Sequence, residues 1–299
     1  MAYHIPVLFN EAIERLSVKE NGVYVDCTFG GGGHSQGILE KLGKHGKLIA
    51  FDQDEDARQN IPGDERVLFI PQNFRHLQRF LRLHKILQVD GVLADLGVSS
   101  FQFDTAERGF STRFQGPMDM RMDTRQPSTA ADVLEKFTEP QLHLMFQNYG
   151  EVSNSKTLAK HIVQNRSSSS VKTIEAFRNM IHPVVMGNPN KYLAQVFQAL
   201  RIEVNDEMGA LKEMLLQLKD VLKPGGRAAI ITFHSIEDRI VKTFFKNGSF
   251  EEEMINPFEN TKKEKIFTLI NKKPITASAE ETKSNTRSRS AKLRVAEKI

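Results

Sequence analysis

The sequence predicts an α/β protein whose parallel sheet is interrupted by a helical insert. Short β-rich runs alternate with helical patterns over the first hundred residues, which is typical of βαβ units and a parallel sheet. Strand patterns almost disappear between residues 105 and 200, and the alternation resumes after them. We therefore expect a sheet domain formed by residues 1–104 and 201–299, and an all-α domain formed by residues 105–200.

The composition is that of a globular chain that can bury a core. Of the 299 residues, 39% are hydrophobic and 26% are charged, and the formal net charge is +4. This charge is uneven, because residues 261–299 hold eleven Lys or Arg against four Glu. We expect a basic C-terminal tail on a slightly acidic body, and composition alone leaves phosphate binding and simple solvation both open.

Simple counts exclude several kinds of site and segment. Cys27 is the only cysteine, so neither an internal disulfide nor a four-cysteine zinc site can form. The histidines and carboxylates lack the spacing of metal ligands, so we expect no metal. No signal-peptide pattern begins the sequence, and no apolar stretch approaches the roughly 20 residues that cross a bilayer. We therefore expect a soluble, cytoplasmic protein without a membrane partner.

Four strands are expected in the first part of the sheet domain. They cover residues 23–25, 47–51, 67–70 and 91–94. The helical patterns between them cover about 38–42, 54–60 and 74–83. Three of these strands are followed directly by an aspartate: Asp26, Asp52 and Asp95.

Helices are expected throughout the insert, and helices and strands in the closing part of the sheet domain. In the insert, helical patterns cover residues 128–137, 139–149, 155–165 and 174–181, with a turn at 187–190. An amphipathic helix over 206–222 then ends at a Pro-Gly-Gly turn. A fifth strand (227–233), a helix (235–246), a loop (251–265) and a closing hairpin pair (265–270 and 291–296) are expected after it.

The most informative segment is the glycine loop, residues 26–35 (DCTFGGGGHS), between the first strand and its helix. Glycines at such a turn allow the backbone to approach a ligand closely. The spacing is neither that of the dinucleotide fingerprint G-x-G-x-x-G nor that of a P-loop. A tight turn without a ligand is the structural alternative, but four consecutive glycines lower backbone stability without packing anything.

The three aspartates favour a cationic ligand at this edge. Asp52, about twenty residues after the glycines, is placed to accept hydrogen bonds from a ribose diol. Asp95 ends the fourth strand, where ligands bind in open α/β sheets. Two cofactor classes fit, a nicotinamide dinucleotide and S-adenosylmethionine. Only the second carries a sulfonium cation and lacks a pyrophosphate, so acids around a non-standard glycine loop favour it.

Ten segments spread in order over nearly the whole chain resemble one family, the bacterial methyltransferases that modify the N4 amino group of a cytosine in 16S ribosomal RNA. The matching segments are 4–8 with Glu11 (HIPVL), 26–35, 52–54 (DQD), 95–100 (DLGVSS), 107–111 (ERGFS), 116–123 (GPMDMRMD), 149–151 (YGE), 197–205 (FQALRIEVN), 233–239 (FHSIEDR) and 287–294 (RSRSAKLR).

The resemblance implies a class I S-adenosylmethionine-dependent methyltransferase with a Rossmann-like sheet and an inserted all-α domain. Its substrate would be a cytidine in the decoding region of 16S ribosomal RNA, or the small ribosomal subunit, and a homodimer is a further expectation. The cofactor contacts that it implies are Gly32, Gly33, His34, Asp52, Phe74, Asp95 and Gln102. Helix-entry packing is an equally good reading of Phe74.

The chain departs from the family pattern in two places. Residues 192–198 (YLAQVFQ) replace a Thr-Arg-Thr-Phe-Gln run, and the turn before them is lengthened. The Asp/Asn/Ser-Pro-Pro-aromatic motif of many amino-methyltransferases is absent, and residues 95–98 occupy the equivalent strand end. The first departure affects local contacts near Phe197.

Methylation of an exocyclic amine needs an acceptor for the amino hydrogens and in-line geometry. Asp95 is the hypothetical catalytic acceptor, while Asn205, Asp206, His234 and Ser235 are weaker candidates. Asn205 can instead cap a helix, and His234-Ser235 can form a strand-to-helix turn.

The target base must leave its stack to reach the methyl group. Phenylalanines between 101 and 114 are candidates for stacking against it. Basic side chains in the loop that enters the helical insert and at the C-terminal end are candidates for phosphate contacts. They are Arg108, Arg113, Arg121, Arg287, Arg289 and Arg294. A nicotinamide-dependent oxidoreductase and a non-catalytic RNA-binding assembly factor remain the alternatives.

Overall fold

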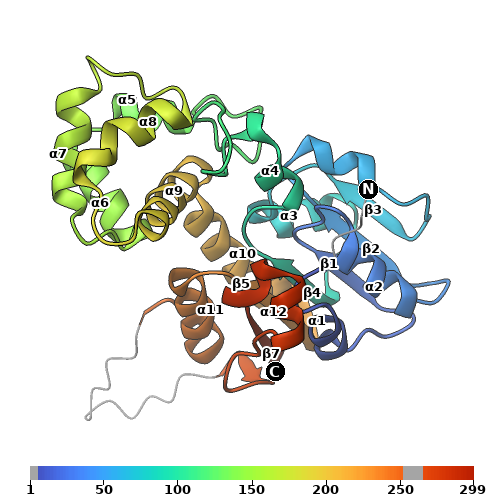
Figure 1. Cartoon of the computed structure of the whole chain (residues 1–299). Helices are drawn as coiled ribbons and strands as arrows, with labels where there is room; N and C mark the ends of the chain where they lie inside the picture. The colour runs from blue at the N-terminus through green and yellow to red at the C-terminus, as the bar shows by residue number, and fades with distance from the viewer. Residues whose placement is uncertain (1–5, 252–264) are drawn as a thin grey trace, which may run out of the picture. The chain divides into compact units, whose positions relative to one another are not determined.

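The structure is a computed structural model of the chain, and it describes residues 6–251 and 265–299 (Figure 1). The chain divides into two compact units: the sheet unit, residues 1–97 and 209–299, and the helical unit, residues 98–208. We expected the divisions at 104/105 and 200/201. The observed helical unit is longer at both ends than expected. Val98 and Phe103 pack against its core, and Asn205 binds backbone of the same unit. That each unit folds as a domain stays a prediction.

The seven strands of the sheet unit have the order β3-β2-β1-β4-β5-β7-β6. Strands β1 to β5 pair in parallel, and β7 runs antiparallel between β5 and β6. The strand order reverses between β1 and β4, and ligands bind beside such a switch point at the carboxyl ends of the strands. The strands are β1 (Val23–Asp26), β2 (Lys47–Phe51), β3 (Val67–Ile70), β4 (Val89–Asp95), β5 (Leu222–Thr232), β6 (Phe267–Leu269) and β7 (Lys292–Lys298).

Helices cover both faces of the sheet, so the parallel strands are apolar on both sides. Alternate strand residues such as Tyr24 and Leu48 pack with α1 (Phe9–Leu16) and α2 (Gly33–Lys41). Their neighbours, such as Ile49, pack against the helices of the other face. Those helices are α3 (Leu77–Leu83), α10 (Glu207–Val221) and α11 (Ser235–Asn247). The short elements of this unit are η1 (Glu55–Asn60), η2 (Phe74–His76), α12 (Ala279–Ser284) and η5 (Thr286–Ser290).

The helical unit encloses a separate apolar core. Its elements are α4 (Ser100–Asp104), η3 (Ala106–Arg108), α5 (Ala130–Lys136), α6 (Glu139–Gly150), α7 (Ser155–Asn165), α8 (Ile174–Ile181), η4 (His182–Val184) and α9 (Pro189–Asn205). Helix α9, which we did not predict, begins at the expected turn. Asn188 accepts hydrogen bonds from the backbone of Asn190 and Lys191, and Pro189 occupies the first turn, a pairing that is a helix-start signal.

Two expectations for the C-terminal segment need correction. Residues 292–298 are not a tail, because β7 is buried between two strands and its Leu293 and Val295 belong to the core. The last two strands do pair, but α12 and η5 lie between them in sequence, so they do not form a simple hairpin. The expected loop at 251–265 lies almost wholly outside the described residues. Within the described ranges, no helix has the length and apolar character needed to cross a membrane.

Asn205 is a structural residue, and its replacement tests this. Its side chain accepts a hydrogen bond from Met122 N and donates one to Met120 O, both at 2.7 Å, in a buried setting. In Asn205→Ala both groups lose a partner, and an unpaired buried polar group costs about 1–3 kcal/mol. We expect urea unfolding to show a loss of about 3 kcal/mol, against less than about 0.5 kcal/mol for the exposed Asn190→Ala. Equal midpoints for the two variants would contradict this role.

Candidate functional site

The glycine loop forms the turn between β1 and α2 at the carboxyl edge of the sheet. Gly32 has φ +78° and directly precedes α2. A Cβ on Gly33 would lie 2.3 Å from Pro6 Cγ, so no side chain fits there without movement. The first backbone N–H groups of a helix have no partner within it. The loop thus presents backbone donors from Gly33 and His34 at the switch point of the sheet.

Two of the three aspartates hold this loop in place. Asp52 accepts hydrogen bonds from Gly30 N at 2.7 Å and from Asp54 N at 2.8 Å. Asp26 is fully buried and accepts from Ser35 Oγ at 2.7 Å and from Thr28 N at 3.0 Å. Asp26 therefore positions the loop from a fully buried place, whereas Asp52, which holds the same loop, is only half-buried.

His34 and Asp95 face each other at the centre of the site. His34 Nε2 lies 3.1 Å from the carbonyl oxygen of Val7, and His34 Nδ1 lies 3.6 Å from Asp95 Oδ2. A carbonyl oxygen only accepts, so Nε2 carries the proton and Nδ1 offers a lone pair to Asp95. Burial lowers the pKa of His34 to about 4, so the imidazole is neutral near pH 7.

Burial also disfavours negative charge at this edge. It raises the pKa of Asp26, raises that of Asp52 to about 6, and raises that of Asp95 well above its usual range. Nearby Asp26 and Glu237 raise the pKa of Asp95 further. Among the described residues Asp95 Oδ1 is buried without a hydrogen-bond partner. An unpaired buried carboxyl oxygen among mutually repelling acids fits a cationic ligand such as a sulfonium.

Phe74 and Gln102 are placed differently from the other predicted contacts. Phe74 opens η2 after Asn73, whose side chain donates to Gln53 Oε1 at 2.7 Å beyond β2. Its ring packs partly against the sheet core. A contact with the cofactor and a role in packing at the helix entry therefore both stay predictions for Phe74. Gln102 belongs to the helical unit, where its Oε1 accepts from Ser99 N at 3.1 Å. Its contact with the cofactor stays a prediction.

Glu237 is a site residue that we did not predict. It is buried, accepts a hydrogen bond from Phe233 N at 2.8 Å and lies 3.2 Å from His234 Nε2. His234 is the N-cap of α11, which agrees with a strand-to-helix turn at this point. Glu237 lies in the segment 233–239, one of the segments that resemble the family, and this membership could have pointed to it.

Three of the six predicted phosphate-binding arginines make contacts inside the protein, and phosphate binding by them stays a prediction. Arg108 is buried and donates to the carbonyl oxygens of Arg121 and Met122. Arg121 binds both carboxylate oxygens of Asp119, and Arg294 is buried against Asp238 at 2.6 Å. Internal carbonyl and carboxylate oxygens thus take up donors of each of these guanidinium groups.

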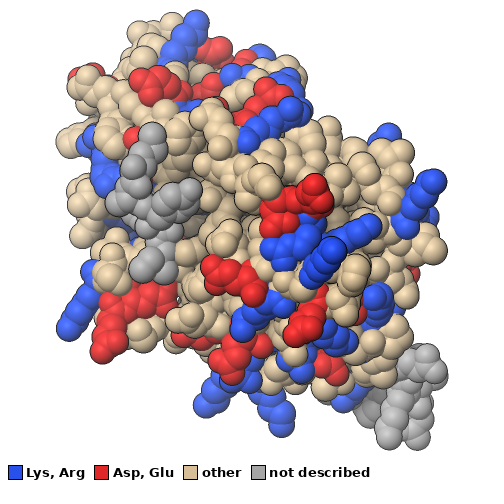
Figure 2. Space-filling model, turned by 90° about the vertical axis from the view of Figure 1, so that its right-hand side faces the viewer, with Lys and Arg blue, Asp and Glu red and all other residues tan. Residues whose placement is uncertain are grey.

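The other three predicted arginines are more accessible. Arg113 is exposed, pairs with Asp104 at 3.0 Å and stacks on Phe103 with its guanidinium 5.0 Å from the ring centre. Arg289 is exposed and Arg287 is half-buried in η5. On the face shown in Figure 2, Lys and Arg side chains lie interspersed with Asp and Glu. Basic charge there is balanced locally.

The strand order, the glycine loop and the acids at the carboxyl ends of β1, β2 and β4 define a class I S-adenosylmethionine-dependent methyltransferase. Gly32, Gly33, His34, Asp52 and Asp95 would hold the cofactor, because they bring backbone donors, a diol acceptor and an unpaired carboxyl oxygen to one edge.

The chain belongs to the MraW methylase family, whose model matches residues 1–299. It is 53% identical over 298 residues to the ribosomal RNA small subunit methyltransferase H of Azobacteroides pseudotrichonymphae, covering 99% of this chain and 98% of that protein. The protein of the same name from Bacteroides thetaiotaomicron is 50% identical, with 100% and 98% covered. An rRNA methylase structure from Streptococcus thermophilus is 13% identical, has a TM-score of 0.41 and is covered to 99%, with 100% of this chain covered.

The protonation of His34 can be read by nitrogen NMR. We expect a neutral ring with the proton on Nε2 from pH 7 down to about pH 5, because burial lowers its pKa to about 4 and Val7 accepts from Nε2. Comparison with His34→Gln assigns the signals. A charged ring at pH 6, or the Nδ1–H tautomer, would show that Nδ1 does not offer a lone pair to Asp95.

The raised pKa of Asp52 predicts a pH dependence of cofactor binding. Above about pH 6 its carboxylate is ionised and accepts hydrogen bonds from the ribose, whereas below it the group is protonated. The affinity for S-adenosylmethionine should fall as the pH drops through 6, by up to about tenfold per pH unit. Calorimetry from pH 7.5 to 5 measures this, and Asp52→Asn should bind more weakly with a flatter profile. A constant wild-type affinity over this range contradicts it.

Proposed function

We propose that this protein transfers a methyl group from S-adenosylmethionine to the N4 amino group of a cytidine in the decoding region of 16S ribosomal RNA. The family membership and the name of its relatives support a small-subunit RNA substrate. The observation that carries the proposal is the carboxyl group of Asp95, with one buried unpaired oxygen, at the end of β4. It offers an acceptor at the strand end where the cofactor residues meet.

The chemistry explains why such an acceptor is needed. The lone pair of the cytosine amine is delocalised into the ring, so the amine attacks poorly until a hydrogen bond localises that pair. S-adenosylmethionine supplies a methyl group on a sulfonium: the new C–N bond forms as the S–C bond breaks, and one amino proton must then leave. Asp95 accepts that proton, and it ionises more readily beside a cation than in the free protein. While Asp95 is protonated, its O–H can point towards His34 Nδ1, which lies 3.6 Å from Oδ2, and this preference is lost when the carboxyl group ionises.

The RNA contacts belong to residues whose side chains reach solvent. Arg113, Arg287 and Arg289 remain the candidates among the predicted arginines, since the other three serve internal contacts. Phe101 is 55% exposed and is the stacking candidate for a flipped base, whereas Phe110 is buried in the core of the helical unit. The small ribosomal subunit as substrate, the cytoplasmic location and a homodimer remain part of this proposal.

Asp95→Asn tests the catalytic role. The amide keeps the size of the side chain but cannot take a proton, so we expect methyl transfer to fall by about 100-fold or more. Calorimetry should show S-adenosylmethionine affinity within about tenfold of wild type. Asp64→Asn, which only breaks a surface pair with Arg66, should keep full activity. Full activity of Asp95→Asn with normal cofactor binding would refute the role.

The substrate is decided by mass analysis of 16S ribosomal RNA from cells with and without the gene. We expect one cytidine in the decoding region to lose a methyl group on N4 when the gene is deleted, and to regain it with the purified protein. An unchanged cytidine pattern would refute the substrate, whatever the result with Asp95→Asn.

A further inference from the structure

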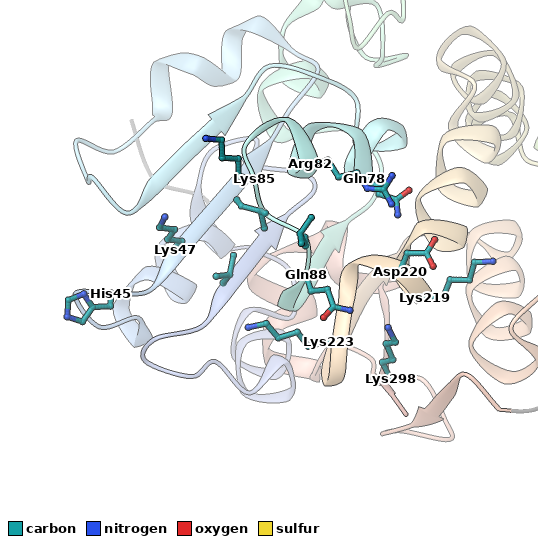
Figure 3. Close-up of a pocket in the computed structure, with 13 residues that line it drawn as sticks. His45, Lys47, Gln78, Arg82, Lys85, Gln88, Lys219, Asp220, Lys223 and Lys298 are labelled. Carbon is teal, nitrogen blue, oxygen red and sulfur yellow. The ribbon is translucent and has the colours of Figure 1, made fainter.

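We propose that a basic hollow at the amino edge of the sheet binds the phosphodiester backbone of the RNA substrate, away from the methylated base (Figure 3). The proposal rests on RNA being the substrate. The hollow lies wholly within the sheet unit, where β1, β2, β4 and β5 begin and β7 ends. We define it by its lining residues: Val23, His45, Lys47, Gln78, Arg82, Lys85, Ile86, Leu87, Gln88, Lys219, Asp220, Lys223 and Lys298.

The lining is strongly cationic. It contains six Lys or Arg side chains and His45, against one carboxylate, Asp220. Lys223 is neutralised by Asp90 at 2.7 Å. The other five cations pair with no carboxylate among the described residues, unlike Arg66 or Arg121, each of which is bound to an aspartate. Lys298 Nζ donates to the carbonyl oxygen of Leu222 at 2.7 Å but keeps its charge. An excess of positive charge without carboxylate partners attracts a polyanion.

The distribution of these cations favours a polymer over a small anion. Lys47 begins β2, Arg82 lies in α3 and Lys85 in the turn after it, Lys219 is near the end of α10, and Lys298 ends β7. Figure 3 shows their side chains spread along the hollow rather than converging on one point. The hollow is about 870 Å³ in volume. Regularly spaced phosphates can contact such a row together, whereas a single phosphate reaches few of its members.

An RNA backbone fits the lining better than a membrane does. Leu87 is 75% exposed, but the other exposed lining residues, Gln88 among them, are polar or charged. The adjoining helix α3 buries Leu77 and Leu81 in the sheet core, so these apolar side chains are not available to a membrane. Lysine, arginine and glutamine are donors to phosphate and sugar oxygens.

The hollow and the site of methyl transfer lie at opposite ends of the same strand. β4 runs from Val89, next to the hollow residue Gln88, to Asp95, and its seven residues span about 23 Å. RNA bound at the hollow therefore lies several nucleotides or a helical segment away from the target cytidine. Contacts there strengthen binding of a large RNA without touching the reacting atoms.

Charge reversal tests this directly. The variant Lys47→Glu/Arg82→Glu/Lys85→Glu is compared with Lys242→Glu/Lys246→Glu/Lys272→Glu, three exposed lysines of the same unit outside the hollow. Fluorescence anisotropy with a 16S ribosomal RNA transcript measures affinity between 50 and 200 mM salt. We expect the hollow variant to bind at least about tenfold more weakly than the control, with a salt slope smaller by about 2, as for three lost phosphate contacts.

Further readouts separate the outcomes. Affinity for S-adenosylmethionine should be unchanged, which shows that the variant is folded, and kcat at saturating transcript should stay within about twofold while KM rises. Equal RNA affinity and salt slope in the two variants would overturn the proposal, as would wild-type binding to phosphatidylserine vesicles that only the hollow variant loses, with RNA binding intact. If the wild type binds the transcript but never methylates it, the proposed function fails while the anisotropy comparison still decides the hollow.

Discussion

The site depends on hydrogen bonds that join three strand ends through carboxyl groups and the glycine loop. Asp26 and Asp52 accept backbone N–H groups of the loop and of the turn after β2, and Thr28 Oγ1 accepts from Asp95 N at 2.7 Å. These bonds tie β1, β2 and β4 together at one edge. Buried carboxyl groups are tolerated only where donors surround them. The loop backbone supplies those donors. The glycine loop and the acidic strand ends therefore stabilise each other.

The same arrangement leaves one carboxyl group without a full set of donors. Asp26 and Asp52 each accept two or more hydrogen bonds, whereas one oxygen of Asp95 has none among the described residues and the other faces a histidine lone pair. An unpaired polar atom lowers stability in the free protein. A group that stays unsatisfied until its ligand arrives gains a partner on binding. The imbalance between these acids therefore separates the positioning residues from the candidate for chemistry.

Much of this could be predicted from the sequence, and the exceptions have physical causes. Strands β1 to β4 were predicted because short apolar runs end in an aspartate or a turn. Helix α9 was missed because its start, Asn188-Pro189, has the composition of a turn and of a helix cap alike. The roles of Arg108 and Arg294 could not be read from charge. A guanidinium that binds carbonyls inside the fold has the same sequence signal as one that binds phosphate. Glu237 was missed because only the fold brings it near Asp95.

The sheet separates two electrostatic tasks between its two edges. The carboxyl edge gathers acids whose mutual repulsion suits a cation, and the amino edge gathers lysines and one arginine, most of them without a carboxylate partner, that suit an anion. Placing both sets of charges at one edge would weaken both sites, since a lysine near Asp95 would compete with the cationic ligand, and further acids beside Asp220 would reduce the positive charge of the hollow. The parallel strands keep these groups apart by the length of β4. Because a Coulomb interaction weakens with distance, two sites about 23 Å apart affect each other little. The protein can therefore hold a negatively charged polymer with one edge and a positively charged methyl donor with the other.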